Sequence, residues 1–398
     1  MAMINLSEQE VGTLEQIAQE GAAPQTQRAQ AVLLAAEGKA VSEVSISTQL
    51  TTRQVNYWLK QYAEHGLEIF PGTTVTPSKK APRQPRLPKV DKPGVLPDDP
   101  MSEGGRKVMA YHLARLLEEE VNVRDEAHGE AIHDMRVATR RLRSALDIFG
   151  PYYRKHVTKM LRRDLRKLGR ALGAVRDLEV VRKRFETDIE TMDASIREGL
   201  QPLLDAWQDQ LKADRDDLLN LLDGERYTDL IDYLVEFVST PYSEAIERPD
   251  PQDPTPFLAR HVAPVLIYQK YENVRAYEPF LAGAALDTLH ALRIEAKRLR
   301  YTLEAFEEVL ASDAKRVIEA TKALQDHLGE LQDARVATGM MQDFIRHSDD
   351  YQPVTPILHY LAVREDEKQR LLAAVGESWE AFVHPDIRRA LGRSIALL

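Results

Sequence analysis

The chain repeats HDMRVATRRLRSALDIF, residues 133–149, as HALRIEAKRLRYTLEAF, residues 290–306. Seven of the seventeen aligned positions are identical, and most of the others exchange residues of the same class. The two segments start 157 residues apart. Similarity of this density at one fixed offset indicates an internal duplication.

Both copies have the periodicity of amphipathic helices. The apolar stripes consist of Ile132, Met135, Thr139, Leu142, Leu146 and Phe149 in the first copy, and of Leu289, Leu292, Ala296, Leu299, Leu303 and Phe306 in the second. A cationic stripe lies beside each and consists of His133, Arg136, Arg140 and Arg143, repeated as His290, Arg293, Lys297 and Arg300. A core requires only the apolar stripe, so the repeated cations predict a basic groove between helices.

The next predicted helix separates apolar and cationic residues to opposite sides. One side carries Leu161, Leu165, Leu168 and Leu172, and the other carries Lys159, Arg163, Arg166 and Arg170. Like charges at i, i+4 destabilise a helix by a few tenths of a kcal/mol per pair. A bound anion would relieve this repulsion. The second copy is weaker in charge, because the corresponding residues are Lys315, Glu319, Lys322 and Asp326.

The duplication extends into this second helix, where LGAVRD at residues 172–177 matches LGELQD at residues 328–333. Each copy therefore contains at least two helices, near residues 131–181 and 288–338. We expect two related helical bundles whose basic faces meet. Asp177 and Asp333 are expected to pair with a nearby Arg, with general acid–base work as the alternative, and Gly173 and Gly329 to allow close helix packing.

The whole chain of 398 residues predicts an all-α protein with more than one structural unit. Residues 1–70 have a helical pattern, and residues 101–398 are helical almost throughout. Residues 71–100 contain eight Pro and six Lys/Arg and show no periodicity, which predicts a semi-rigid linker.

Composition limits the classes of function. Cys is absent, which excludes disulfides and thiolate metal sites. The net charge is −10, but residues 131–184 carry sixteen Lys/Arg against five Asp/Glu, a local excess of +11. An acidic protein can still focus positive potential on one surface. Neither a signal sequence nor an apolar run of about 20 residues is present, so we expect a cytoplasmic protein without a membrane partner.

The segment from residue 101 to 398 resembles the CHAD family, the conserved histidine α-helical domain. The resemblance rests on GRKVMAYHL, residues 105–113, on the two repeated helices, and on LGAVRD and LGELQDARV. It implies two four-helix bundles around a basic channel that binds inorganic polyphosphate, which could direct the protein to polyphosphate granules. We expect the first copy to make most of the phosphate contacts, because it has more cations.

The predicted phosphate-binding residues are the cations of the duplicated helices. They are His133, Arg136, Arg140, Arg141, Arg143, Lys159, Arg163, Arg166, Arg170, Arg176, His290, Arg293, Lys297, Arg298, Arg300 and Lys322. The guanidinium fork of Arg donates two hydrogen bonds to paired phosphate oxygens. For the two histidines, a structural hydrogen bond at the bundle seam and a metal site are the alternatives. Metal is disfavoured because no other His or carboxylate recurs beside both.

The stretch AVSEVSISTQLTTRQVNYWLKQY, residues 40–62, resembles helix-turn-helix modules of transposases and regulators. Its second helix, capped by Thr51, would bury Val55, Trp58, Leu59 and Tyr62. The outer face would present Arg53, Asn56, Tyr57 and Lys60 to DNA. Gln49 stands at the turn position that is usually Gly. A protein-interaction module is the alternative.

The sequence lacks a phosphate-cradling Gly-rich loop, a metalloprotease motif and a nucleophile elbow. We therefore expect a polyphosphate-binding protein that is not an enzyme and needs no cofactor. Two alternatives remain. One is a DNA-binding regulator whose helical domain senses a phosphate-rich ligand, and the other is a metal-dependent phosphohydrolase that uses His133 and His290.

Overall fold

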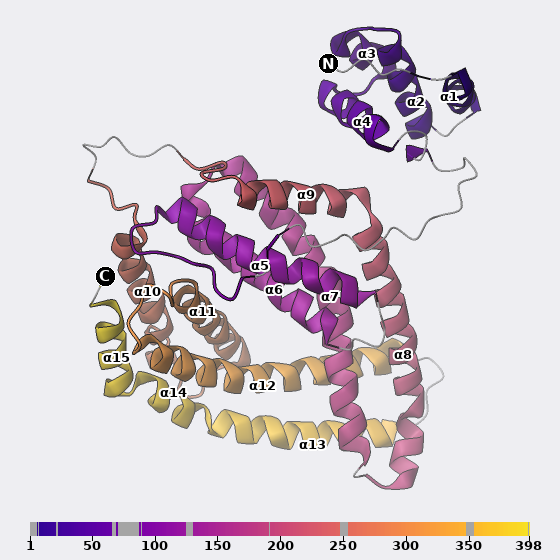
Figure 1. The fold of residues 1–398 in the computed structure, drawn as a ribbon. Coiled ribbons are helices and arrows are strands. Elements are labelled where there is room, and N and C mark those ends of the chain that lie inside the picture. Colours follow the sequence, from indigo (N-terminus) through magenta and orange to yellow (C-terminus); the bar gives the residue numbers. More distant parts are fainter. Residues whose placement is uncertain are drawn as a thin grey trace. The chain divides into compact units, whose positions relative to one another are not determined.

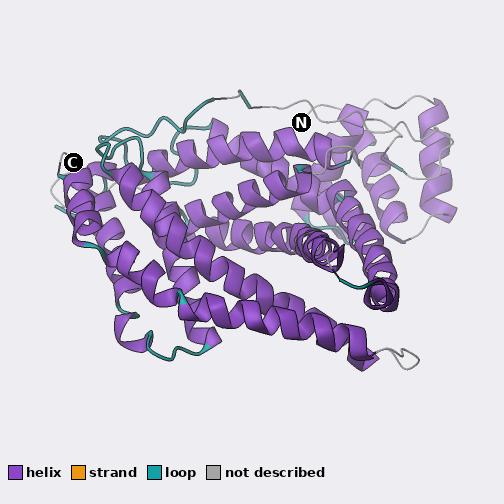
Figure 2. Cartoon of the chain, turned by 90° about the horizontal axis from the view of Figure 1, so that it is seen from below, coloured by secondary structure: helices purple, strands orange, loops and turns teal. Residues whose placement is uncertain are grey.

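The computed structural model shows two compact units, Met1–Arg83 and Gln84–Leu398. Both are helical, and the described residues contain no strand beyond two isolated bridges, which confirms the all-α prediction (Figures 1 and 2). The structure describes residues 6, 8–20, 23–65, 69–70, 87–88, 90–124, 130–190, 192–246, 254–347, 354–396 and 398.

The first unit is a small helical domain with its own core. Its helices are α1 (Glu8–Glu20), α2 (Ala23–Ala36), α3 (Val41–Thr48) and α4 (Thr52–His65). Val55, Leu59 and Tyr62 of α4 are buried against Leu14 of α1 and Val44 of α3. Apolar spacing on α4 thus fixes which of its faces points inward.

In the turn between α3 and α4, Gln49 stands where helix-turn-helix modules usually have glycine. Gln49 has φ 58° and ψ 18°, the left-handed conformation that glycine adopts more easily. Thr51 then caps α4, because its Oγ1 accepts a hydrogen bond from the Gln54 amide at 3.3 Å. In turn, the Thr51 amide donates a hydrogen bond to Gln54 Oε1 at 2.9 Å. This reciprocal pair is a capping box, so the helix-turn-helix geometry forms without the glycine.

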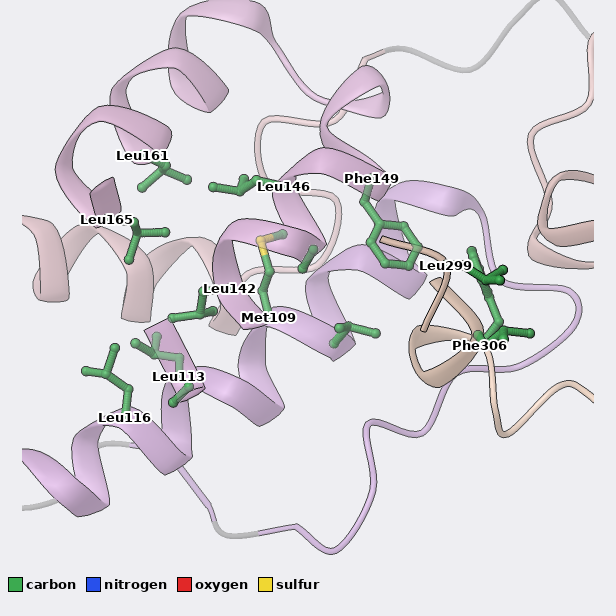
Figure 3. Packing of buried hydrophobic residues seen from close by; sticks show 14 of the residues in the cluster. Met109, Leu113, Leu116, Leu142, Leu146, Phe149, Leu161, Leu165, Leu299 and Phe306 are labelled. Atoms are coloured by element: carbon green, nitrogen blue, oxygen red, sulfur yellow. The ribbon is translucent and has the colours of Figure 1, made fainter. Parts of the chain in front are cut away.

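The second unit begins with a bundle that contains the first repeat. Its helices are α5 (Met101–Val123), α6 (Ala131–Phe149), the short 3₁₀ helix η2 (Gly150–Tyr152), α7 (Lys155–Glu190), α8 (Ala194–Asp223) and α9 (Glu225–Ser239). The leucines of α6 and α7 face each other and the apolar side of α5 (Figure 3). A Cβ at Gly105 would lie 2.6 Å from Phe149 Cβ, so only glycine lets α5 approach α6 this closely.

The second bundle contains the second repeat. Its helices are α10 (Ala259–Arg275), the 3₁₀ helix η3 (Glu278–Phe280), α11 (Leu286–Ala305), α12 (Ala314–His347), α13 (Val354–Ala373), α14 (Val375–Val383) and α15 (Pro385–Ile395). The closing residues of the two repeats, Phe149 and Phe306, meet with ring centroids 5.4 Å apart. The two bundles therefore share one continuous hydrophobic core.

A smaller apolar cluster joins the far ends of the long helices α7, α8, α12 and α13 (Figure 1). Phe185 of α7 packs against Trp207 of α8 and Tyr360 of α13, with ring centroids 5.1 and 4.7 Å apart. The Tyr360 hydroxyl also donates to Asp188 at 2.8 Å. The two repeats are thus connected at this end as well as at the shared core.

Part of the predicted linker is packed on the second unit. Val95 is buried in its core, and the amides of Gly94 and Val95 donate to Glu308 Oε2 at 2.7 and 3.0 Å. Residues 71–86 of the predicted linker lie outside the described residues.

Candidate functional site

The cationic stripes of the two repeats come together where α6 packs against α11. Lys297 of α11 lies within electrostatic range of Arg140 and Arg143 of α6 as well as Arg293 of its own helix. Burial, followed by these cations, lowers the pKa of Lys297 to about 8. The structure therefore brings the two stripes into one strongly positive surface.

Tyr301 lies among three guanidinium groups of this surface. The Arg141, Arg300 and Arg140 guanidinium carbons lie 4.2, 5.2 and 5.8 Å from the ring centroid of Tyr301, which is itself buried. The quadrupole of an aromatic ring attracts cations over its face. Burial lowers the pKa of Arg140, and Arg136, Arg141 and Arg300 lower it further.

Two arginines of this surface lack a hydrogen-bond partner for a buried Nε atom in the part of the chain that the structure describes. Neither Arg140 nor Arg293 forms a hydrogen bond or ion pair there, and the Nε atom of each is buried. A buried donor without a partner costs roughly 1–3 kcal/mol, and more when it is charged. An anion that accepts from these groups would remove this cost.

The cations of α7 line one exposed side of that helix. The residues that the sequence placed there, Lys159, Arg163, Arg166 and Arg170, are all exposed, while the leucines opposite are buried. Arg163 forms two hydrogen bonds to Asp164, at 3.0 and 2.9 Å.

The α7 row leads to the α6 cations. It continues at helical spacing to Asp177, whose Oδ1 accepts from Arg136 Nη1 at 2.7 Å. The Arg143 side chain of α6 also lies against α7. Its Nη1 is 3.5 Å from the position that a Cβ at Gly169 would occupy. We call the combined set the cationic band: Arg136, Arg140, Arg143, Lys159, Arg163, Arg166, Arg170, Arg293, Lys297 and Arg300.

The second repeat contributes fewer cations. Lys322 is exposed on α12, but Glu319 and Asp326 are exposed on the same helix. Arg293 lies beside Gly329, with its Nε 3.6 Å from where a Cβ would stand. Gly329 therefore makes room for an arginine. Gly173 has no contact of this kind, since the nearest atom is Asp177 Oδ2 at 3.8 Å.

Three predicted arginines outside the cationic band are paired with carboxylates. Arg141 pairs with Glu304, Arg298 with Glu295, and Arg176 with both Glu130 and Glu179. These three arginines are not part of the cationic band. Arg136, Arg163 and Arg300 of the band also have carboxylate partners, which are Asp177, Asp164 and Glu304.

The two predicted histidines differ in their surroundings. His290 Nδ1 lies 2.8 Å from Gln332 Oε1, a hydrogen bond between α11 and α12. His133 has no hydrogen bond to the described residues. Within those residues, no group of three or more His, Asp or Glu side chains is placed to hold a metal ion.

A third histidine, His112 of α5, was not singled out in the sequence. It lines a cavity of about 1060 Å³ together with Tyr111, Arg115 and Arg141. Burial, followed by the two arginines, lowers the pKa of His112 to about 3, so the imidazole is neutral. Tyr301 was missed as well, because Ser144 occupies its position in the first repeat and no duplicated signal marks it.

The helix α4 of the first unit buries the predicted side. Val55, Trp58, Leu59 and Tyr62 are buried, and the Arg28 guanidinium covers the Trp58 ring at 3.6 Å. Asn56 and Lys60 are exposed, whereas Tyr57 is half-buried. The side chain of Arg53 lies outside the described residues.

None of the helices in the described ranges is long and apolar enough to cross a membrane.

Known proteins share both parts of this architecture. Residues 23–70 match the homeodomain-like domain family. The CHAD domain from the plant Ricinus communis, known from its crystal structure, has a TM-score of 0.52 at 24% identity and is aligned over 80% of this chain and 98% of its own. PptA from Streptomyces chartreusis has a TM-score of 0.55 at 13% identity, over 71% of this chain and 100% of its own. At these identities the likeness shows the fold alone.

Two curated proteins of Mycobacterium tuberculosis, both named as uncharacterized, are relatives in sequence. MT2285 and Rv2226 are each 29% identical over 257 residues, which is 62% of this chain. The chain spans 46% of the length of these relatives. Residues 107–342, more than half of the chain, match the CHAD domain family. With its duplicated helices and its fold, this chain belongs to the CHAD domain family.

Proposed function

We propose that the second unit binds inorganic polyphosphate on the cationic band. The observation that carries the proposal is the pair of arginines Arg140 and Arg293, whose buried Nε atoms have no hydrogen-bond partner among the described residues. Phosphate oxygens accept hydrogen bonds from guanidinium groups in a bidentate geometry that matches the arginine fork. The pKa of Lys297 is lowered first by burial and then by the surrounding arginines, which supports an excess of positive charge there.

The extent of the band favours a long ligand over a single phosphate. Lys159 and Arg170 are eleven residues apart on α7, which is about 17 Å along a helix. Orthophosphate can contact only one cluster at a time, whereas a chain of tens of phosphates can contact several at once. Linked contacts act at high effective concentration, so affinity should rise steeply with chain length.

Charge reversal tests the proposal. We expect Arg136→Glu, Arg140→Glu and Arg293→Glu together to abolish binding of long-chain polyphosphate, measured by calorimetry, with unchanged helicity by circular dichroism. The logarithm of the wild-type affinity should fall linearly with the logarithm of salt concentration.

The control reverses three exposed cations outside the band, Arg197, Lys212 and Arg388. It changes the net charge by the same amount but should keep most of the affinity. Equal losses in both triple variants would contradict a defined site. Release of orthophosphate from the polymer, sensitive to chelator, would instead favour the phosphohydrolase.

A second candidate function is DNA binding by the first unit. The match of residues 23–70 to the homeodomain-like family and the exposure of Asn56 and Lys60 on α4 favour it. In such domains this helix enters the major groove. The protein would then combine DNA binding with a polyphosphate-binding unit, either as a regulator or as a protein of polyphosphate granules.

A further inference from the structure

Two carboxylates stand among the cations at equivalent positions of the two repeats. Asp177 of α7 accepts a hydrogen bond from Arg136 at 2.7 Å. Asp333 of α12 lies within electrostatic range of Arg293, Asp177 and Arg136. The Arg136–Asp177 ion pair therefore lies near Asp333 and Arg293, where the repeats meet.

These pairs contribute little to the stability of the fold. The Arg136 and Asp177 side chains are 31% and 59% exposed, and ion pairs at such sites contribute roughly 0–1 kcal/mol. Asp333 also keeps contact with solvent, although burial by the surrounding helices raises its pKa. Packing requirements therefore do not account for two carboxylates at this position.

We propose that Asp177 and Asp333 are internal counter-anions, which offset the charges of Arg136 and Arg293 in the ligand-free protein and are displaced by incoming phosphate. The inference rests on the phosphate binding proposed above. In this role the two aspartates lower the affinity for phosphate. An aspartate that oriented Arg136 for its ligand would raise it.

Displacement affects short and long ligands to different extents. A single phosphate group that reaches Arg136 exchanges one carboxylate for one phosphate and gains little. A long chain makes the same exchange at Arg136, with the same small gain. It also contacts the uncompensated cations of α7, such as Arg166 and Arg170, and gains affinity there. The two aspartates therefore raise the minimum chain length that binds at a given ligand concentration.

The chain provides a closely matched control. Asp223 of α8 accepts from Arg124 Nη1 at 2.7 Å, with side-chain exposures of 62% and 37% for Asp223 and Arg124. Asp223 thus has the same partner type, distance and exposure as Asp177, but it lies outside the cationic band. Asp177→Asn and Asp223→Asn change the net charge equally and remove one comparable ion pair each.

We expect Asp177→Asn to tighten binding of long-chain polyphosphate by at least about fivefold at 0.1 M salt, the factor that Coulomb's law gives for one charge at about 4 Å in water. Asp223→Asn should leave the dissociation constant within twofold of wild type. Asp333→Asn added to Asp177→Asn should tighten binding further. Weaker binding in Asp177→Asn, or the same change in both single variants, would overturn the inference and assign Asp177 an orienting role.

A measurement without polyphosphate separates this inference from the proposed function. With its counter-anion removed, the band should respond more strongly to sulfate, so the melting temperature of Asp177→Asn should rise with added sulfate more than that of Asp223→Asn. An equal response of the two variants would count against internal counter-anions. If wild type and all variants fail to bind polyphosphate, the proposed function fails, while the sulfate comparison still decides whether the aspartates neutralise the band.

Discussion

At the scale of single residues, Lys297 makes the site sensitive to pH. Its pKa of about 8 lies below the ordinary value of 10.5, because burial and the neighbouring arginines disfavour the ammonium form. A bound polyanion favours that form and raises the pKa. Binding near pH 8 should therefore take up protons, and the affinity should decrease as the pH rises from 8 to 10.

Calorimetry in two buffers of different ionisation enthalpy measures this proton uptake. Lys297→Arg should abolish it, since arginine stays charged throughout this range.

Lys297 also predicts how the stability of the protein changes with pH. Its pKa is lower in the folded protein than in the unfolded chain, so its destabilising effect is full below pH 8 and is relieved as the pH rises towards 10.5. Proton uptake that persists unchanged in Lys297→Arg would contradict this assignment.

At the scale of elements, the turn between α3 and α4 has a measurable strain. The left-handed conformation of Gln49 costs roughly 1–2 kcal/mol relative to glycine. Glycine in turn loses more chain entropy on folding, by roughly 0.5–1 kcal/mol. We expect Gln49→Gly to stabilise the first unit by about 0.5–1 kcal/mol in urea unfolding.

Gly38 supplies the opposite substitution. It follows α2 with φ 84°, and no atom lies within 4 Å of where its Cβ would stand. Gly38→Ala should therefore destabilise the same unit through the backbone alone. A loss of stability in Gln49→Gly would mean that the Gln49 side chain has contacts that outweigh the strain.

The elements also show what the sequence could predict. Helical periodicity and the duplication identified α6, α7, α11 and α12 and the buried side of each, because these depend on residues close in the chain. The approach of α5 to α6 at Gly105 and the packing of Val95 could not be predicted, because both depend on partners far along the chain. The stripes predicted Arg140 and Lys297, but their lowered pKa values follow first from burial and then from the cations around them, some of which lie on the neighbouring helix.

At the scale of the whole molecule, we expect each of the two units to keep its own binding activity as a separate fragment. Each has its own hydrophobic core, and the cationic band lies entirely in the second. A fragment that starts at Gln84 should keep the full affinity for polyphosphate, because it also retains Val95, which packs in the core. A fragment that starts at Met101 would lack Val95 and should be less stable.

The first unit should carry any binding to DNA. In a mobility-shift assay on genomic fragments, residues 1–83 should bind, and Asn56→Ala with Lys60→Ala should abolish the shift. Polyphosphate affinity of the full chain serves as the control and should be unchanged in this double variant. A small unit that binds no fragment would be assigned to protein interaction.

The contact between Phe149 and Phe306 has a consequence for how such a chain could arise. A protein with a single copy of the repeat would expose this phenylalanine and could bury it against the same residue of a second molecule, in a two-fold symmetric dimer. Fusion of two copies makes the partner permanent and removes the requirement that both halves be identical. Glu319 and Asp326 then show what that freedom permits, since one half can exchange cations for carboxylates while the other retains them.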